Sequence, residues 1–144
     1  MLDFSNSKIL IVGDVMLDKY YFGKVDRISP EAPVPIVNIQ KEESRLGGAS
    51  NVANNIVSLG GHSLLCGVIG HDLFGKEIER ISRHKNIDTF LLKTSSPTIT
   101  KARIIGGKQQ IVRVDYEDKS ELNADNKKLF RDTISRILPE YDIL

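Results

Sequence analysis

Two aspartates follow the first apolar segment of the chain, at a place where α/β proteins commonly contact their ligands. The segment KILIVGD is a short, unbroken β-prone run that ends in glycine and aspartate, which is typical of a buried parallel strand. Ligands of open α/β sheets sit beyond the carboxyl ends of such strands. Asp14 and Asp18 in GDVMLDKY lie just past that end, so we expect their carboxylates to contact a ligand. The alternative is that both aspartates only cap a turn.

A pair of glycines is a second candidate for ligand contact. Gly47 and Gly48 come directly before a predicted helix. Without a Cβ the backbone can approach a ligand closely, and the free N–H groups and dipole of the helix start favour oxygen-rich or anionic groups. Alternatively, the glycines serve only to make a tight loop. Their spacing is neither that of a P-loop, which ends in Gly-Lys-Ser/Thr, nor the dinucleotide-binding G-x-G-x-x-G.

Alternating strands and helices must position these residues. The helix after the glycine pair is predicted to begin at Ser50, with Ser50 or Asn51 as its cap. Its apolar residues at helical spacing are Val52, Ile56 and Leu59, and its stop signal is a second glycine pair, Gly60 and Gly61. Segments 62–70 and 87–94 are predicted strands on either side of a helix over 72–86, whose inner side carries Leu73, Ile78 and Ile81. This alternation indicates an α/β fold.

Other segments are predicted to lie outside the central sheet. Residues 19–43 are rich in aromatic and β-branched residues, but the prolines that interrupt them are typical of peripheral strands. Residues 98–118 alternate in polarity around the turn GGK, which predicts a hairpin. A last amphipathic helix is predicted over 124–138, with a buried stripe of Leu129, Ile134, Ile137 and Leu138.

The composition argues against several classes of protein. A formal net charge of +1 over 144 residues shows no basic excess of the kind that suggests a nucleic-acid partner. The N-terminal apolar run is too short for a signal peptide or a membrane span, so no membrane partner is expected. The single cysteine, Cys66, is predicted to be a buried structural thiol, and we expect a cytoplasmic protein. His62, His71 and His84 are widely spread, which favours helix-end or surface positions.

Five motifs together resemble those of the ribokinase-like (PfkB) carbohydrate kinases. They are VGDVMLD, RISPEAPVP, LGGASNVANNIVSLGG, VIGHDLFG and TKARIIGGKQQIVRVDYED, and they run over nearly the whole chain. Two of them, RISPEAPVP and QQIVRVDYED, are similar to the branch of this family that acts on heptose 7-phosphate. The resemblance implies an α/β, Rossmann-like ribokinase fold, here its N-terminal half, with a central mostly parallel sheet flanked by helices and a small β lid. The implied core covers residues 1–19, 46–96 and 117–144, and the implied lid strands lie at about 20–45 and 97–116.

The resemblance also implies roles for the candidate residues. Asp18 matches the family's aspartate that grips sugar hydroxyls, a task suited to a carboxylate because it can accept two hydroxyl protons. Asp14 is a second contact, and Gly47, Gly48 and Asn51 match the sugar-binding loop and helix start.

The heptose branch implies a substrate that already carries a phosphate, and this requires a cationic pocket. The cations expected on the lid strands are Arg27, Lys101, Arg103 and Arg113, of which Lys101 and Arg103 are the first choice. The alternative for each is a solvated charge at a strand edge.

The implied activity is transfer of the ATP γ-phosphoryl group, with Mg²⁺, to O1 of D-glycero-β-D-manno-heptose 7-phosphate in ADP-heptose and lipopolysaccharide core synthesis. A homodimer through the β lid is also implied. The family's GAGD-type catalytic motif does not occur in the 144 residues, and nothing in them resembles its adenine site. This chain alone is therefore expected to transfer phosphate poorly or not at all.

Two other interpretations stay open. The chain can be a non-catalytic unit, either a sugar-phosphate binder or a lid-mediated dimerisation module. A dinucleotide-dependent oxidoreductase is a weaker alternative, because the first strand lacks the required glycine spacing.

Overall fold

A three-stranded parallel sheet lies at the centre of the fold. The structure, a computed structural model, describes residues 4–144. The strands of this core sheet are β1 (Lys8–Val12), β4 (His62–Gly70) and β5 (Asp88–Thr94), in the order β1-β4-β5. Both β1 and β5 run parallel to β4, as the nearly continuous apolar runs in these segments predict.

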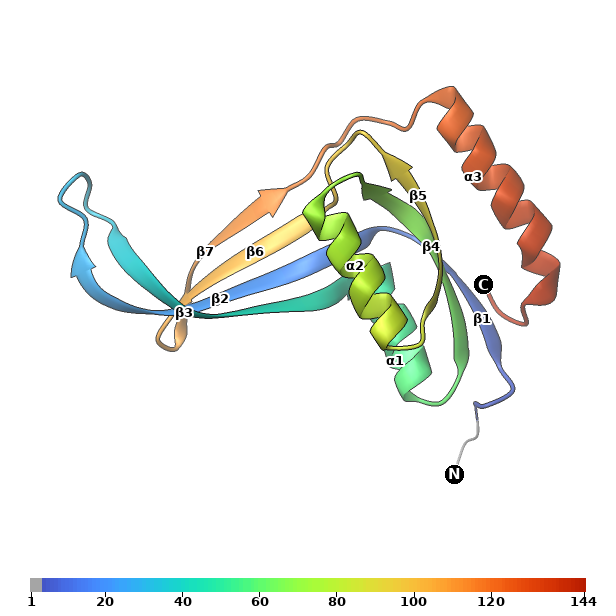
Figure 1. Cartoon of the computed structure of the whole chain (residues 1–144), viewed down its shortest axis with the longest axis horizontal. Helices are drawn as coiled ribbons and strands as arrows, with labels where there is room; N and C mark the ends of the chain where they lie inside the picture. Colours follow the sequence, from blue (N-terminus) through green and yellow to red (C-terminus); the bar gives the residue numbers. More distant parts are fainter. Residues whose placement is uncertain (1–3) are drawn as a thin grey trace.

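Helices lie on both sides of the core sheet (Figure 1). On one side are α1 (Ala49–Ser58) and α2 (Leu73–His84), and on the other is α3 (Ala124–Ile137), which continues into the 3-10 turn η1 (Leu138–Glu140). After η1 the chain returns to β1, where Ile143 pairs with Ile9 in parallel. None of the helices within residues 4–144 is long and apolar enough to cross a membrane.

A second, four-stranded sheet extends away from the core (Figure 1). This outer sheet consists of β2 (Val15–Ile28), β3 (Pro35–Gly48), β6 (Thr100–Gly106) and β7 (Gln109–Tyr116), in the order β3-β2-β6-β7. Strand β2 is antiparallel to β3 and parallel to β6, and β6 turns back into β7 at Gly107. The predicted peripheral strands and hairpin therefore form one sheet.

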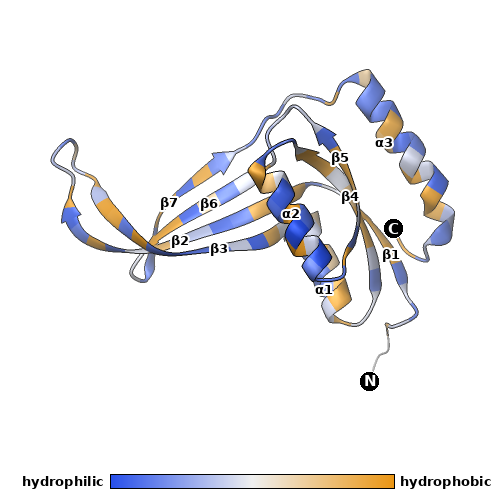
Figure 2. Cartoon of the chain, in the orientation of Figure 1, coloured by the Kyte–Doolittle hydropathy of each residue, from blue (hydrophilic) through white to orange (hydrophobic). Residues whose placement is uncertain are grey.

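One hydrophobic core joins the two sheets. Leu17 and Leu46 at the base of the outer sheet belong to the same buried cluster as Leu65 of β4 and Ile78 of α2. In Figure 2 the visible surface of α2 is largely hydrophilic, whereas β4 is largely hydrophobic. The amphipathic helix thus buries its apolar side against the sheet.

A partly buried polar contact fixes the start of β6 against α2. Asp72 is the N-cap of α2, and its carboxylate accepts hydrogen bonds from the backbone N–H of Gly75 and of Thr98, each at 2.7 Å. The Thr98 hydroxyl also donates to Asp72 at 2.8 Å and accepts from the N–H of Gly70 at 2.8 Å. Two residues after Thr98, β6 begins, so this contact anchors one strand of the outer sheet to the core.

The predicted inner faces of α1 and α2 were partly wrong. In α2, Ile78 and Ile81 are buried as predicted, but Leu73 is 78% exposed. It lies five positions before Ile78, about 140° away around a helix of 3.6 residues per turn. In α1, Ala53 is fully buried while Val52 and Leu59 are exposed, because the small side chain faces β4 and lets the helix pack closely.

The predicted stripe of α3 is only partly buried, with Ile134 and Ile137 half-buried. Leu129 and Leu138 are exposed, and Thr133 is the buried residue of this helix. Its aromatic contact with the core sheet is Phe130 against Phe90, with ring centroids 5.9 Å apart. The helix lies on one side of the core sheet, and two of the four residues of the predicted stripe face solvent.

Candidate functional site

Asp18 lies within β2, on the outer sheet. It follows the end of β1 as expected, but it does not cap a turn, because β2 begins at Val15, three residues before it. Val15 and Leu17 are buried in the core, so the alternation of a strand directs the intervening and following side chains, including Asp18, to the opposite face.

Gly47 makes room for the Asp18 carboxylate. It lies on β3 opposite Met16, next to the pair formed by Asp18 and Arg45. A Cβ on Gly47 would stand 2.5 Å from Asp18 Oδ2 and 2.9 Å from Met16 Cγ, both closer than real contacts. The carboxylate therefore lies directly over glycine backbone, and the close approach at Gly47 is that of the Asp18 side chain.

Gly48 forms the junction between β3 and α1. It is the N-cap of α1 with φ 55°, a conformation that favours glycine, and a Cβ there would meet the Asp14 carbonyl oxygen at 2.5 Å. That carbonyl accepts a hydrogen bond from the N–H of Ala49 at 2.9 Å. The backbone of Asp14 thus holds the start of α1, and its side chain is exposed beside it.

The predicted side-chain cap of α1 was wrong. Neither Ser50 nor Asn51 is the N-cap, and Gly48 provides no side-chain hydrogen bond. The buried Ser50 hydroxyl instead donates to the carbonyl oxygen of Gly47 at 2.6 Å, which fixes the glycine pair under Asp18. Asn51 is exposed in the first turn of the helix. Because the Ala49 N–H is already used by the Asp14 carbonyl oxygen, only the later N–H groups of the first turn can serve another partner.

Arg103 of β6 completes this group from the other side of β2. Its Nη1 donates to Asp18 Oδ1 at 2.5 Å, and this hydrogen bond raises the pKa of the guanidinium. The pair is only partly exposed. A cation held against a carboxylate beside free helix N–H groups can bind a ligand that carries both hydroxyls and negative charge.

Lys101 and Arg113 lie on the same face of the outer sheet. Lys101 is directly opposite Asp18 on one side and Asp115 on the other, with its Nζ 3.8 Å from Asp115 Oδ2. Arg113 is opposite Arg103 and donates to both carboxylate oxygens of Asp115, at 2.8 and 2.9 Å. Hydrogen bonding from Arg113 lowers the pKa of Asp115. Both cations are therefore positioned by one carboxylate.

Arg27 does not lie with the other candidate residues. It pairs with Ile36 near the tip of the outer sheet and lines a separate cavity of about 480 Å³. At about 3.3 Å per residue, the strand separates it from Asp18 by roughly 30 Å of chain. Within this chain the structure does not bring Arg27 to the Asp18 group.

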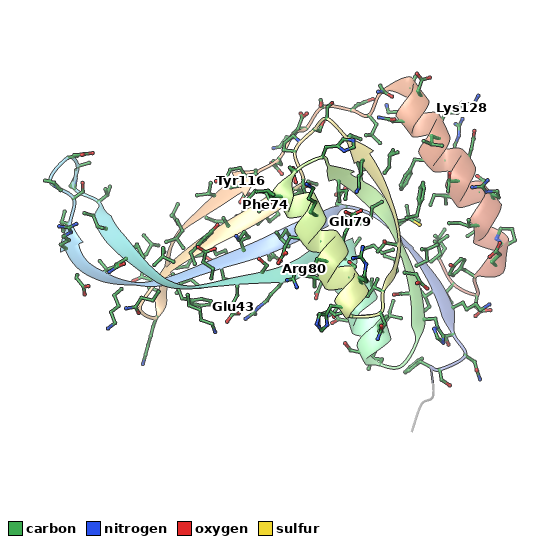
Figure 3. The ribbon with its side chains drawn as sticks, viewed as in Figure 1. Glu43, Phe74, Glu79, Arg80, Tyr116 and Lys128 are labelled. Atoms are coloured by element: carbon green, nitrogen blue, oxygen red, sulfur yellow. The ribbon has the colours of Figure 1, made fainter. Side chains whose placement is uncertain are left out.

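Three further residues lie with this group although no sequence motif pointed to them, namely Tyr20, Glu43 and Arg45. Residues that pair across strands share a face. Asp18 and Arg45 form one row on this surface, and Tyr20 forms a second row with Glu43 and Arg103. We call this surface the charged face. Figure 3 shows Glu43 along β3 and Tyr116 along β7, at opposite edges of the outer sheet. The Tyr116 ring lies 5.8 Å from that of Phe74 in α2. Asp18 and Tyr20 are two positions apart, so the sequence alone could have placed both side chains on one face of a strand. It could not add residues of β3 to that face, because the pairing register of β3 against β2 was unknown.

The other candidate groups are not part of this site. Cys66 is buried as predicted, and burial raises the pKa of its thiol to about 11. His62, His71 and His84 are all exposed, at a strand start, after a strand end and at a helix end, in agreement with the prediction. Over residues 4–144, no three His, Cys, Asp or Glu side chains gather in a way that could hold a metal ion.

Comparison with known proteins adds three findings. The family described as pfkB family carbohydrate kinase matches residues 6–138. The chain is 47% identical over 137 residues to "Bifunctional protein HldE" of a Nitratiruptor species, covering 95% of this chain and 30% of that protein. It is 45% identical over 141 residues to "D-beta-D-heptose 7-phosphate kinase" of Bordetella bronchiseptica, covering 97% and 44%. The chain thus spans less than half the length of these curated relatives.

A solved structure shows the same fold. Phosphofructokinase-2 from Escherichia coli, in complex with fructose-6-phosphate, superposes with a TM-score of 0.67 at 17% identity, over 91% of this chain and 41% of that one. At this identity the likeness concerns the fold alone.

Proposed function

Because the chain belongs to the pfkB family of carbohydrate kinases, we propose that it forms the sugar-binding part of a kinase that phosphorylates a sugar phosphate. The observation that carries this proposal is the position of Asp18. Its carboxylate lies over the bare backbone of Gly47, beside the N-terminus of α1 and within hydrogen-bonding distance of Arg103. A polyol carrying a phosphate matches this combination of acceptor, donors and positive charge.

The hydroxyl-binding part of the site consists of Asp18 and the α1 junction. The second oxygen of the Asp18 carboxylate is not used by Arg103 and can accept hydroxyl protons. Gly47 leaves room for the Asp18 carboxylate that faces the sugar, and Gly48 lets the Asp14 carbonyl oxygen approach the start of α1. In this proposal Asn51 in the first turn binds sugar hydroxyls and Asp14 provides a second carboxylate.

The substrate proposed is D-glycero-β-D-manno-heptose 7-phosphate, phosphorylated at O1 with ATP and Mg²⁺ in ADP-heptose and lipopolysaccharide core synthesis. Support comes from the relative named D-beta-D-heptose 7-phosphate kinase, 45% identical over 97% of this chain. In this proposal Lys101, Arg103 and Arg113 face the 7-phosphate, since guanidinium and ammonium groups suit a dianion. Arg27 has no role at this site within the same chain.

The chemical step requires groups that these residues do not supply. Neither a GAGD motif nor a recognisable adenine site occurs in the 144 residues. General-base catalysis and anion stabilisation each contribute factors of about 10² or more. We therefore expect this chain alone to bind the sugar phosphate without transferring a phosphoryl group to it at an appreciable rate.

Isothermal titration of the chain with heptose 7-phosphate tests the proposal, with ATP and Mg²⁺ as a comparison. We expect the sugar phosphate to bind without ATP, and Asp18→Asn to weaken this binding by roughly ten- to a hundredfold, since hydrogen bonds to charged groups contribute about 1.5–3 kcal/mol. Asp125→Asn, at an exposed position in α3, is the matched control. Unchanged affinity in Asp18→Asn, or no binding by the wild-type chain, contradicts the proposal.

We also propose that the outer sheet is the lid of this kinase and the surface through which two copies dimerise. Every residue of β7 is exposed, including Val112 and Val114, and exposed apolar residues continue at Val25 and Ile39. An apolar sheet with an unpaired edge strand is a surface that a second copy can cover. This observation also favours the alternative function, a dimerisation module without catalysis.

Sedimentation equilibrium distinguishes these possibilities. We expect a dimer that Val112→Asp converts to monomers, whereas Leu59→Asp, at an exposed apolar position just after α1, leaves the dimer intact. A dimer that binds no sugar phosphate supports the dimerisation module alone. A wild-type monomer at all concentrations contradicts the proposed interface.

A further inference from the structure

Tyr20 contacts two guanidinium groups from the strands on either side of it. The Cζ of Arg45 on β3 lies 4.8 Å from the centroid of the Tyr20 ring, and the Cζ of Arg103 on β6 lies 5.2 Å from it. Both distances are within the range of cation–π attraction, which is about 6 Å. One ring on the central strand β2 therefore fixes cations from both neighbouring strands.

The ring is itself held in place by its neighbours. Phe22, two residues along β2, stacks on Tyr20 with centroids 6.1 Å apart and an angle of 11° between the planes. Directly opposite Tyr20 on β3 is Glu43, which accepts a hydrogen bond from Arg45 Nη2 at 2.7 Å. Arg45 is thus held by a ring and by a carboxylate at the same time.

Contact with a ring differs from contact with a carboxylate in what it leaves available. A carboxylate balances the charge of a guanidinium and occupies some of its N–H groups, whereas an aromatic face attracts the cation and leaves its N–H edge available. Arg45 has both kinds of contact, with Glu43 and with the Tyr20 ring, and Arg103 likewise contacts Asp18 and the ring. Within residues 4–144, both hydrogen bonds of Arg103 use Nη1 and that of Arg45 uses Nη2. The remaining nitrogens of both groups are free to bind an anion.

We propose that Tyr20 is a positioning residue that holds the guanidinium groups of Arg45 and Arg103 for the phosphate of the sugar substrate, and that Arg45 is itself a phosphate-binding residue. This inference rests on the proposed function, because it assigns the phosphate end of the same substrate. Asp18 binds hydroxyls next to Gly47, and the two arginines bind the phosphate further out on the charged face. The ring determines specificity for phosphorylated over unphosphorylated sugar.

The test compares two ligands, heptose 7-phosphate and the same heptose without phosphate, by titration calorimetry on the full chain. The ratio of their dissociation constants measures what the phosphate contributes. We expect Tyr20→Leu and Arg45→Gln each to reduce this ratio about tenfold while leaving binding of the unphosphorylated heptose within about twofold of wild type. Tyr20→Phe retains the ring and is expected to retain the ratio.

Tyr21→Leu is the matched control, because the neighbouring side chain points to the other face of the outer sheet, where Lys19 lies over it at 5.1 Å. It removes a ring of the same size from the same strand and should leave the ratio unchanged. An unchanged ratio in Tyr20→Leu overturns the inference, and so does an equal loss in Tyr20→Phe, which would assign the effect to the hydroxyl.

A second measurement detects the contact without any ligand. In the wild-type protein the ring current of Tyr20 shifts the Nε–H proton signals of Arg45 and Arg103, and we expect Tyr20→Leu to remove these shifts and Tyr20→Phe to keep them. Signals that do not move in Tyr20→Leu overturn the inference even where the sugar phosphate binds. If the wild-type chain binds neither sugar, the proposed function fails and this inference fails with it.

Discussion

At the scale of single residues, the site depends on the absence of a side chain at Gly47 as much as on the carboxylate of Asp18. The carboxylate occupies the space that any side chain at position 47 would need, and the Ser50 hydroxyl fixes the glycine carbonyl beneath it. Arg103 then orients the carboxylate from the neighbouring strand. Three strands and one helix start are therefore coupled through close contacts around a single carboxylate.

Gly47→Ala tests this dependence. The new Cβ would stand 2.5 Å from Asp18 Oδ2, so the carboxylate must move, and we expect the dissociation constant for the sugar phosphate to rise about tenfold or more. Calorimetric titration measures it. Gly60→Ala is the control, because its φ of 90° strains any other residue but nothing lies within 4 Å of the added Cβ. It should lower stability without changing affinity, and equal affinity in both variants would contradict the prediction.

At the scale of elements, the outer sheet is held to the core by the shared hydrophobic cluster and by polar contacts, of which the one between Asp72 and Thr98 involves an ionisable group. Burial of Asp72 favours its neutral form, but hydrogen bonds from the N–H of Thr98 and Gly75 and from the Thr98 hydroxyl outweigh burial and lower the pKa below its ordinary 3.8. The same residue caps α2, so one carboxylate fixes both a helix start and the approach to β6.

The lowered pKa predicts a pH dependence of stability. Since the unfolded chain takes up a proton on this group at higher pH than the folded one, the stabilisation is fully present above about pH 4 and is lost as the pH falls through the folded pKa. Asp72→Asn keeps the acceptor for Gly75 but places an NH₂ group against the N–H of Thr98, which we expect to cost about 1–2 kcal/mol at pH 7.

Urea unfolding from about pH 7 to about pH 2.5 measures this effect. The difference in unfolding free energy between wild type and Asp72→Asn should shrink below about pH 4, and a difference that is constant with pH would contradict the assignment. Asp125→Asn, exposed in the first turn of α3, should stay within about 0.5 kcal/mol of wild type throughout.

At the scale of the whole molecule, β1 forms one edge of the core sheet. It pairs with β4 on one side, and on the other it bonds to Asp142 and Ile143 of the C-terminal segment. An apolar groove of about 500 Å³ runs along it, and its lining residues are Ile9, Leu10, Ile11, Val12, Val52, Ile56, Ile134, Ile143 and Leu144. The exposed Val52 of α1 and the half-buried Ile134 of α3 therefore meet at one surface.

This groove should bind a hydrophobic dye in the folded protein. We expect anilinonaphthalene sulfonate to fluoresce with the native chain, and Val52→Asp to reduce that fluorescence several-fold because it places a charge in the lining. Leu59→Asp, at the end of the same helix but outside the groove, should leave it unchanged. Native protein that does not enhance the dye's fluorescence would show that the groove is closed in solution.

The sequence by itself determined the family, the α/β class, the order of strands and helices, and the glycine pair before a helix, and all of these are confirmed. These properties are local, because strand and helix periodicity, turn glycines and short motifs involve residues that are close together in the sequence. The sequence also selected Asp18, Gly47 and Arg103, which the structure brings together, although their role in binding sugar stays a prediction.

Only the tertiary structure decided the register of β3 and β6 against β2, and with it which side chains share the charged face. The structure adds Arg45 and Tyr20 to the candidate site and places Arg27 far from it. Pairing between strands that are distant in sequence decides which side chains lie close together. The helix faces of α1 and α3 were mispredicted for a related reason. Hydrophobic spacing shows that a helix has an apolar side, but the burial of Ala53 and the exposure of Leu129 depend on what packs against each helix.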